Sequence, residues 1–164
     1  MVSWCSLRPT RSSGIIEVKS RVTPSTFRDA VSKLAGDIEL VRRHSNIRAF
    51  AGLFSYEGSD QDSDAYLRAV ADSCETWNRR LDFASIGRST FIRYWNEDPE
   101  ASRHMLESWH SYSLRQMSVG YFVSNVVDAV APGSVGRNRF AWFPHESKEA
   151  RRTGVQAGQW TTET

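Results

Sequence analysis

A strand, a helix and a second strand follow one another near the start of the chain, and this pattern restricts the fold most. The stretch "GIIEVKSRVTPSTF", residues 14–27, begins as a β-branched apolar run and ends as a helix start, with Thr23 as N-cap and Pro24 at the first helical position. Apolar residues then recur at spacings of four and three up to about residue 44. Residues 47–58 predict a second, buried strand. Such a unit is a right-handed crossover between parallel strands, so we expect an α/β domain with a central mixed sheet flanked by helices.

Weaker patterns follow this unit. Residues 62–79 carry an apolar stripe at helical spacing, and residues 81–95 predict a hairpin of two short strands around Gly87. Residues 99–130 predict a long helix, because the last part, "QMSVGYFVSNVVDAV", is apolar nearly all round and is followed by Pro-Gly.

The chain has the size and polarity of one soluble domain with irregular ends. Its 164 residues are 40% hydrophobic and 24% charged, which is enough for one sizeable core. We expect the α/β domain to span residues 14–131. Residues 1–13 are expected to be an irregular N-terminal segment that is not native to the fold, and residues 132–164 an irregular C-terminal tail.

Composition excludes several classes of protein. The net charge of +2 permits a nucleic-acid partner without requiring one. Two cysteines give no support to a disulfide framework or a metal cluster. No apolar run approaches the roughly 18 residues of a membrane span, and the first residues lack the apolar core of a signal peptide. We therefore expect a cytoplasmic protein without a membrane partner, and the oligomeric state stays open.

Glu17 and Lys19 interrupt the first apolar strand with two opposite charges. Side chains alternate between the faces of a strand, so the carboxylate and the ammonium project from the same face. For an arbitrary E-x-K sequence, an ordinary ion pair on a half-exposed strand is the default interpretation. Here the pair ends an apolar strand that leads directly into a helix and a second buried strand.

This context resembles the catalytic half of the restriction-endonuclease-like PD-(D/E)xK nucleases, whose P-D…(D/E)-x-K signature lies on the two arms of a hairpin. More specifically, "GIIEVKSRVTPSTFRDAVSKLAGD" is similar to an uncharacterised bacterial family of nuclease-like proteins known as a domain of unknown function. That family has an "IEVKS" strand, a helix with a "KLA" segment and a later helix similar to "VGYFVSNVVDAV". The resemblance covers residues 14–131 and implies a restriction-endonuclease-like core that lacks its N-terminal part.

The resemblance implies Mg²⁺-dependent hydrolysis of a phosphodiester in DNA or RNA. Glu17 would be a metal ligand, since Mg²⁺ is held by hard oxygens. Lys19 would orient the attacking water, act as a base or stabilise charge on the phosphate. This assigns catalytic roles to Glu17 and Lys19, with Mg²⁺ as the cofactor.

The predicted hairpin supplies candidate contacts to nucleic acid. Arg88 and Arg93 stand among aromatic residues that could stack on bases, namely Phe91, Tyr94 and Trp95. The alternative is that alternate members of this group pack in the core of the hairpin. Both interpretations are compatible with the sequence.

The sequence departs from the nuclease pattern at one decisive place. Residues 1–16 contain neither Asp nor Glu, so the first metal ligand of the family is absent. Two explanations stay open: the chain is an N-terminally shortened fragment of a nuclease, or it is a non-catalytic module of the same fold that binds nucleic acid or a protein. In the second case Glu17 and Lys19 form a structural ion pair. Under both explanations we expect no cleavage by the chain as given.

Other candidate chemistry is weaker. The four histidines have no spacing typical of a metal site. Cys74, at an apolar helical position, is expected to be a small buried hydrophobe rather than a nucleophile.

Overall fold

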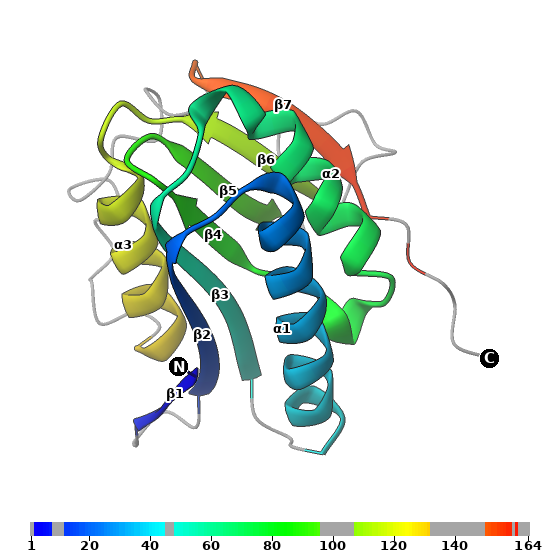
Figure 1. Ribbon diagram of the computed structural model, residues 1–164. Coiled ribbons are helices and arrows are strands. Elements are labelled where there is room, and N and C mark those ends of the chain that lie inside the picture. Colours follow the sequence, from blue (N-terminus) through cyan, green and yellow to red (C-terminus); the bar gives the residue numbers. More distant parts are fainter. Residues whose placement is uncertain are drawn as a thin grey trace.

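A seven-stranded mixed sheet forms the centre of the molecule, and its strands lie side by side in the order in which they occur in the sequence. The computed structural model describes residues 2–7, 12–44, 48–95, 107–131, 150–158 and 160. Figure 1 shows α1 and α2 on one side of the sheet and α3 on the other. The expected α/β class, with helices flanking a mixed sheet, is confirmed.

The elements have the following bounds. The strands are β1 (Val2–Leu7), β2 (Ser12–Arg21), β3 (Arg48–Glu57), β4 (Phe83–Ile86), β5 (Thr90–Trp95), β6 (Ser108–Ser113) and β7 (Arg152–Ala157). The α-helices are α1 (Pro24–His44), α2 (Ser63–Ser73) and α3 (Ser118–Val130), and the 3₁₀ helices are η1 (Asp60–Asp62) and η2 (Trp77–Arg79). Strands β2, β3 and β4 run parallel, and every other neighbouring pair is antiparallel.

The predicted strand, helix and strand are confirmed. β2 pairs in parallel with β3, which places Ile15 beside Ala51. The Thr23 hydroxyl accepts a hydrogen bond from the Thr26 N–H at 3.4 Å, and the Thr26 hydroxyl accepts one from the Thr23 N–H at 2.9 Å. This reciprocal cap satisfies backbone donors that an open helix start would leave unpaired, and it fixes where α1 begins.

The two faces of the sheet carry separate cores because each strand alternates its side chains. Ile15 and Leu53 pack with α1 and α2 in one core. Phe50 and Phe83 pack with Phe122 of α3 in the other. Glu17 follows Ile15 by two residues, so its side chain points to the face that α1 covers.

The predicted hairpin is also confirmed. β4 and β5 pair antiparallel, and Gly87 in the turn between them has φ +60°. A Cβ at Gly87 would lie 3.2 Å from the Gly58 carbonyl oxygen, so the turn also depends on a close approach of two backbones.

The long helix predicted over residues 99–130 is confirmed only in its last part, where α3 spans Ser118–Val130. Residues 108–113 form β6, and α3 begins only at Ser118; residues 99–106 lie outside the described part. β6 is buried on both faces, with Trp109 in the α1 core and Tyr112 in the α3 core. Because both faces are buried, β6 has no alternation of polar and apolar residues, and its serines and histidine hide its burial in the sequence.

The ends of the sheet correct two further predictions. Residues 2–7 and 152–157, expected to be irregular, are the strands β1 and β7. β1 pairs antiparallel with β2, so the β2 edge has a neighbour. The helix predicted over residues 62–79 ends at Ser73, and η2 follows as a separate turn. Residues 132–149 lie outside the described part.

Candidate functional site

Glu17 and Lys19 form a direct ion pair on the α1 face of β2. The Lys19 Nζ lies 2.9 Å from the Glu17 Oε1. The Glu17 side chain is 5% exposed and the Lys19 side chain 39% exposed, so the lysine lies toward solvent and the carboxylate beneath it. The prediction that both side chains share one face is confirmed. The expectation that both would be reachable from solvent is wrong for Glu17.

The neighbouring strands offer no second carboxylate beside Glu17. Its register partners are Val2 on β1 and Leu53 on β3. β1 is present as a hairpin arm beside β2, and its sequence, VSWCSL, contains no acidic residue.

A Mg²⁺ site would need more oxygen ligands than these strands supply. In the described part of the chain, no group of three His, Cys, Asp or Glu side chains is placed to hold a metal ion. The charge of Glu17 is already matched by Lys19 at hydrogen-bond distance. The residues around Glu17 therefore do not fit the metal that the resemblance implies.

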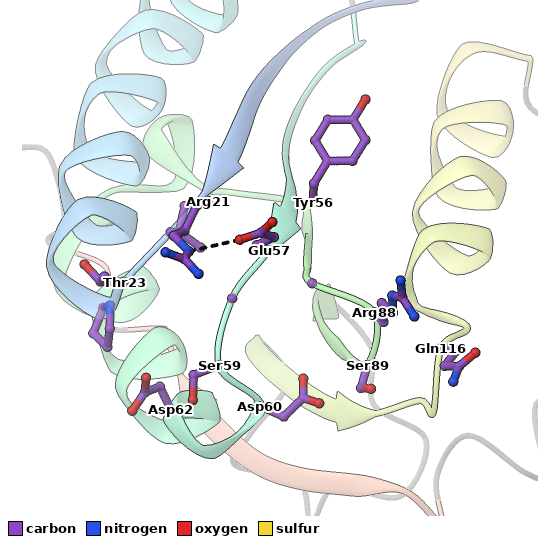
Figure 2. A pocket seen from close by; sticks show the side chains of 14 residues that line it. Arg21, Thr23, Tyr56, Glu57, Ser59, Asp60, Asp62, Arg88, Ser89 and Gln116 are labelled. Atoms are coloured by element: carbon purple, nitrogen blue, oxygen red, sulfur yellow. Dashed lines mark ion pairs between the residues drawn. The ribbon is translucent and has the colours of Figure 1, made fainter.

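An open hollow of about 680 Å³ lies at the carboxyl ends of the three parallel strands. Figure 2 shows Arg21 and Glu57 in its centre, Asp60 and Asp62 on one side, and Arg88 with Gln116 on the side of α3. Arg21 and Glu57 form a largely exposed ion pair, with 3.0 Å between Nε and Oε2. In open α/β sheets, this crevice outside the carboxyl ends of the strands is where ligands bind.

Hydrogen bonds between segments that are distant in the sequence hold the rim of this hollow together. The Val22 N–H donates to the Glu57 carbonyl at 3.0 Å, which ties the end of β2 to the end of β3. The Ser118 hydroxyl donates to the Gly87 carbonyl at 2.9 Å, which fixes the start of α3 beside the hairpin turn. The rim is therefore built from segments that are far apart in the sequence.

Charge is unevenly distributed along this rim. The first turns of α1 and α3 contain no acidic residue, so the positive ends of both helix dipoles face it without a compensating carboxylate. Arg21 and Arg88 add two exposed guanidinium groups. Asp60, Asp62 and Asp64 gather instead around the start of α2. Glu57 matches the charge of Arg21, so the basic side of the hollow consists of Arg88 and the helix starts, and the acidic side lies at α2.

The predicted site residues fall into three separate places. Arg88 lines the hollow. Arg93 lies further along β5, where its Cζ stacks 4.1 Å above the centre of the Trp95 ring. Phe91 and Tyr94 are buried, as the packing interpretation of the hairpin predicted. Glu17 and Lys19 are not among the residues that line the hollow.

Comparison with known proteins adds no assignment. Neither a protein-family model nor a curated protein matches the chain. Among the described residues, none of the helices combines the length and the apolar character needed to cross a membrane.

Sequence reasoning missed Arg21, Ser59 and Gln116 as residues of the hollow. A usable signal was present for the first two. Both stand in the segments that follow predicted parallel strands and precede helices, and such carboxyl ends meet at one edge of the sheet. Gln116 follows β6, which the predicted long helix concealed.

Proposed function

We propose that this chain is a non-catalytic relative of the PD-(D/E)xK nucleases that binds nucleic acid at the hollow beside the carboxyl ends of β2, β3 and β4. Glu17 and Lys19 serve it as a structural ion pair. The observation that carries the proposal is the buried Glu17 carboxylate, matched by Lys19 at 2.9 Å and flanked by Val2 and Leu53.

The basic side of the hollow supports the choice of nucleic acid as the ligand. Phosphate groups are attracted to exposed guanidinium groups and to the first turns of helices, where backbone N–H groups are unpaired. Arg88 offers a guanidinium, and the positive dipole ends of α1 and α3 add a favourable potential, although the Thr26 and Ser118 N–H groups already donate to the Thr23 hydroxyl and the Arg88 carbonyl. Arg21 forms an ion pair with Glu57, and both side chains are largely exposed. A phosphate would therefore compete with the Glu57 carboxylate for the Arg21 guanidinium.

The binding half of the proposal is tested with single-stranded and duplex DNA and with RNA at several salt concentrations. We expect binding that weakens as salt rises, and an Arg88→Gln variant that binds all sequences more weakly and lowers the salt slope by about 1. Arg43→Gln is the matched control, because Arg43 lies in the last turn of α1, at the other end of the sheet. Equal affinity of Arg88→Gln and the unmodified chain would reject the hollow as the binding site.

The non-catalytic half is tested by incubating the same nucleic acids with Mg²⁺ or Mn²⁺. We expect no cleavage by the unmodified chain. Metal-dependent cleavage that disappears in both Glu17→Ala and Lys19→Ala would overturn the proposal and establish these residues as catalytic.

A further inference from the structure

A group of aromatic rings lies beside Arg80 at the amino end of β4, at the opposite end of this strand from the hollow. We call Trp77, Arg80, Tyr94 and Trp160 the Arg80 cluster. The ring centres of Trp77, Tyr94 and Trp160 lie 5.8, 5.9 and 6.0 Å from one another, with interplanar angles of 78°, 72° and 67°. The Arg80 Cζ lies 4.0 Å from the centre of the Trp77 ring and 5.0 Å from that of Tyr94. Two rings thus lie against the guanidinium, and Trp160 packs at a steep angle against both of them.

Buried polar atoms without a hydrogen-bond partner are concentrated in this cluster. The Arg80 Nη1, the Tyr94 hydroxyl and the Trp160 Nε1 are all buried and unpartnered. The Thr76 hydroxyl and the Arg79 Nε, from the same turn of chain, share this state. Among the other described residues, only Ser85 has a buried side-chain polar atom without a hydrogen-bond partner. Native proteins rarely leave such groups unsatisfied, so their accumulation in one place indicates a missing partner.

The unpartnered atoms are almost all donors. Guanidinium and indole nitrogens can only donate hydrogen bonds. Tyr94 is 9% exposed, and burial raises the pKa of its hydroxyl, so the hydroxyl keeps its proton and can donate as well. A partner for this set must therefore be an acceptor.

The charge around the cluster points to a negatively charged acceptor. The Asp82 carboxylate receives the Arg42 Nη2 at 2.6 Å and the Arg80 Nε at 2.9 Å, so one carboxylate serves two guanidinium groups. The Arg80 Nη1 is a donor of a charged group, and such a donor forms its strongest hydrogen bonds with an ionised acceptor.

We propose that the Arg80 cluster binds a small oxyanion, a carboxylate or a phosphate group, that accepts hydrogen bonds from the Arg80 Nη1, the Tyr94 hydroxyl and the Trp160 indole N–H. The site goes beyond the proposed nucleic-acid contact and is separate from it, because the two lie at opposite ends of β4. Trp77 is 42% exposed and is the most exposed ring of the cluster, so it marks the side of the cluster that faces solvent.

The experiment titrates the full chain with inorganic phosphate and, separately, with benzoate, by calorimetry and by the shift in melting temperature. Phosphate is tetrahedral and benzoate carries a planar carboxylate on a ring, so the two arms distinguish the sources of the oxyanion. We expect saturable binding of at least one of them. Tyr94→Phe and Trp160→Phe, which keep an aromatic wall and remove one donor each, should weaken binding about tenfold.

Two comparisons make the test decisive. Tyr94→Phe removes an unpartnered buried hydroxyl, so its melting temperature without ligand should equal or exceed that of the unmodified chain. Lys33→Gln changes an exposed lysine of α1 that belongs to neither site, and this variant should bind both anions unchanged. The proposal is overturned if neither anion binds, if binding depends on Arg88 and not on Tyr94, or if only water occupies the cluster in crystals grown with both anions.

Discussion

Lys19 forms an ion pair with a carboxylate that the fold has almost removed from water. A buried charge that loses its partner is strongly destabilising, whereas exchange of the whole pair for apolar residues is often tolerated. The loss of one partner of this pair should therefore lower the free energy of unfolding, whether or not the pair derives from a catalytic site.

The first prediction concerns this pair. Lys19→Met should lower the free energy of unfolding by about 1–3 kcal/mol, because Glu17 stays buried without its counter-charge. The double variant Glu17→Leu with Lys19→Met should recover most of that loss. Lys33→Met, an exposed lysine on α1, is the control and should change stability little. Denaturant unfolding measures all three, and a harmless Lys19→Met would contradict the structural role of the pair.

Cys74 gives a second prediction at this scale. Burial raises the pKa of its thiol to about 12, and the Leu81 backbone and the charge of Arg42 only partly oppose this. The thiol should react with a thiol reagent at pH 8 far more slowly than the same cysteine in unfolded chain. The measurement uses a Cys5→Ser background, so that Cys74 alone reports.

The same shift links stability to pH. The thiol of the unfolded chain has a pKa near 8.5, and at that pH the thiol of the folded chain still holds its proton. The folded state binds the proton more tightly, so the contribution of Cys74 to stability is complete below about pH 8.5 and is lost as the pH rises toward 12. Cys74→Ala should flatten the alkaline decline of stability relative to the unmodified chain.

At the scale of one element, the β4–β5 turn is a place where a single substitution should change the free energy of unfolding. Gly87 has φ +60° and lies against the Gly58 backbone, so Gly87→Ala should destabilise the protein by about 1–2 kcal/mol. Gly36, inside α1, has nothing within 4 Å of an added Cβ. Gly36→Ala should therefore stabilise by about 0.5–1 kcal/mol. Thermal unfolding of both variants would show opposite shifts, and a shared sign would contradict this account of the turn.

The elements that the sequence predicted well are those with a strong local signal. α1 has a Thr-Pro start and a long apolar stripe, and the hairpin has a glycine at its turn. β1 and β7 take part in the sheet through backbone hydrogen bonds, which leave little trace in side-chain pattern. β6 buries Ser111 by pairing its hydroxyl with that of Thr153 at 2.9 Å, a compensation that no local sequence reveals.

The candidate sites were predictable to a smaller degree. Alternation along a strand was enough to place Glu17 and Lys19 on one face, but the burial of Glu17 depends on the elements around β2. The Arg80 cluster joins residues from η2, β5 and the end of the chain, so only the folded arrangement brings its donors together.

At the scale of the whole molecule, the sheet has one hydrophobic core on each face. One core packs against α1 and α2, and the other packs against α3. Leu34→Ala removes apolar contacts on the α1 face, and Phe122→Ala does so on the α3 face. Each should cost about 2–5 kcal/mol. Because the same strands supply both cores, each variant should shift one common unfolding transition, measured by calorimetry and circular dichroism. Two separate transitions would show that the faces unfold independently.

The order of the strands also bears on how the molecule is assembled. Each strand has its sequence neighbours as its spatial neighbours, and the pairings β1–β2 and β4–β5 close short loops, which lose little chain entropy on closing. β7, in contrast, joins β6 across residues 114–151. Proteins whose contacting residues are close in the sequence fold faster than proteins whose strands pair across long sequence separations. A growing chain could therefore add strands to the free edge one after another as they leave the ribosome. Until β7 arrives, that edge is β6, a strand rich in aromatic and serine side chains, and a stalled or shortened chain would present it to its neighbours.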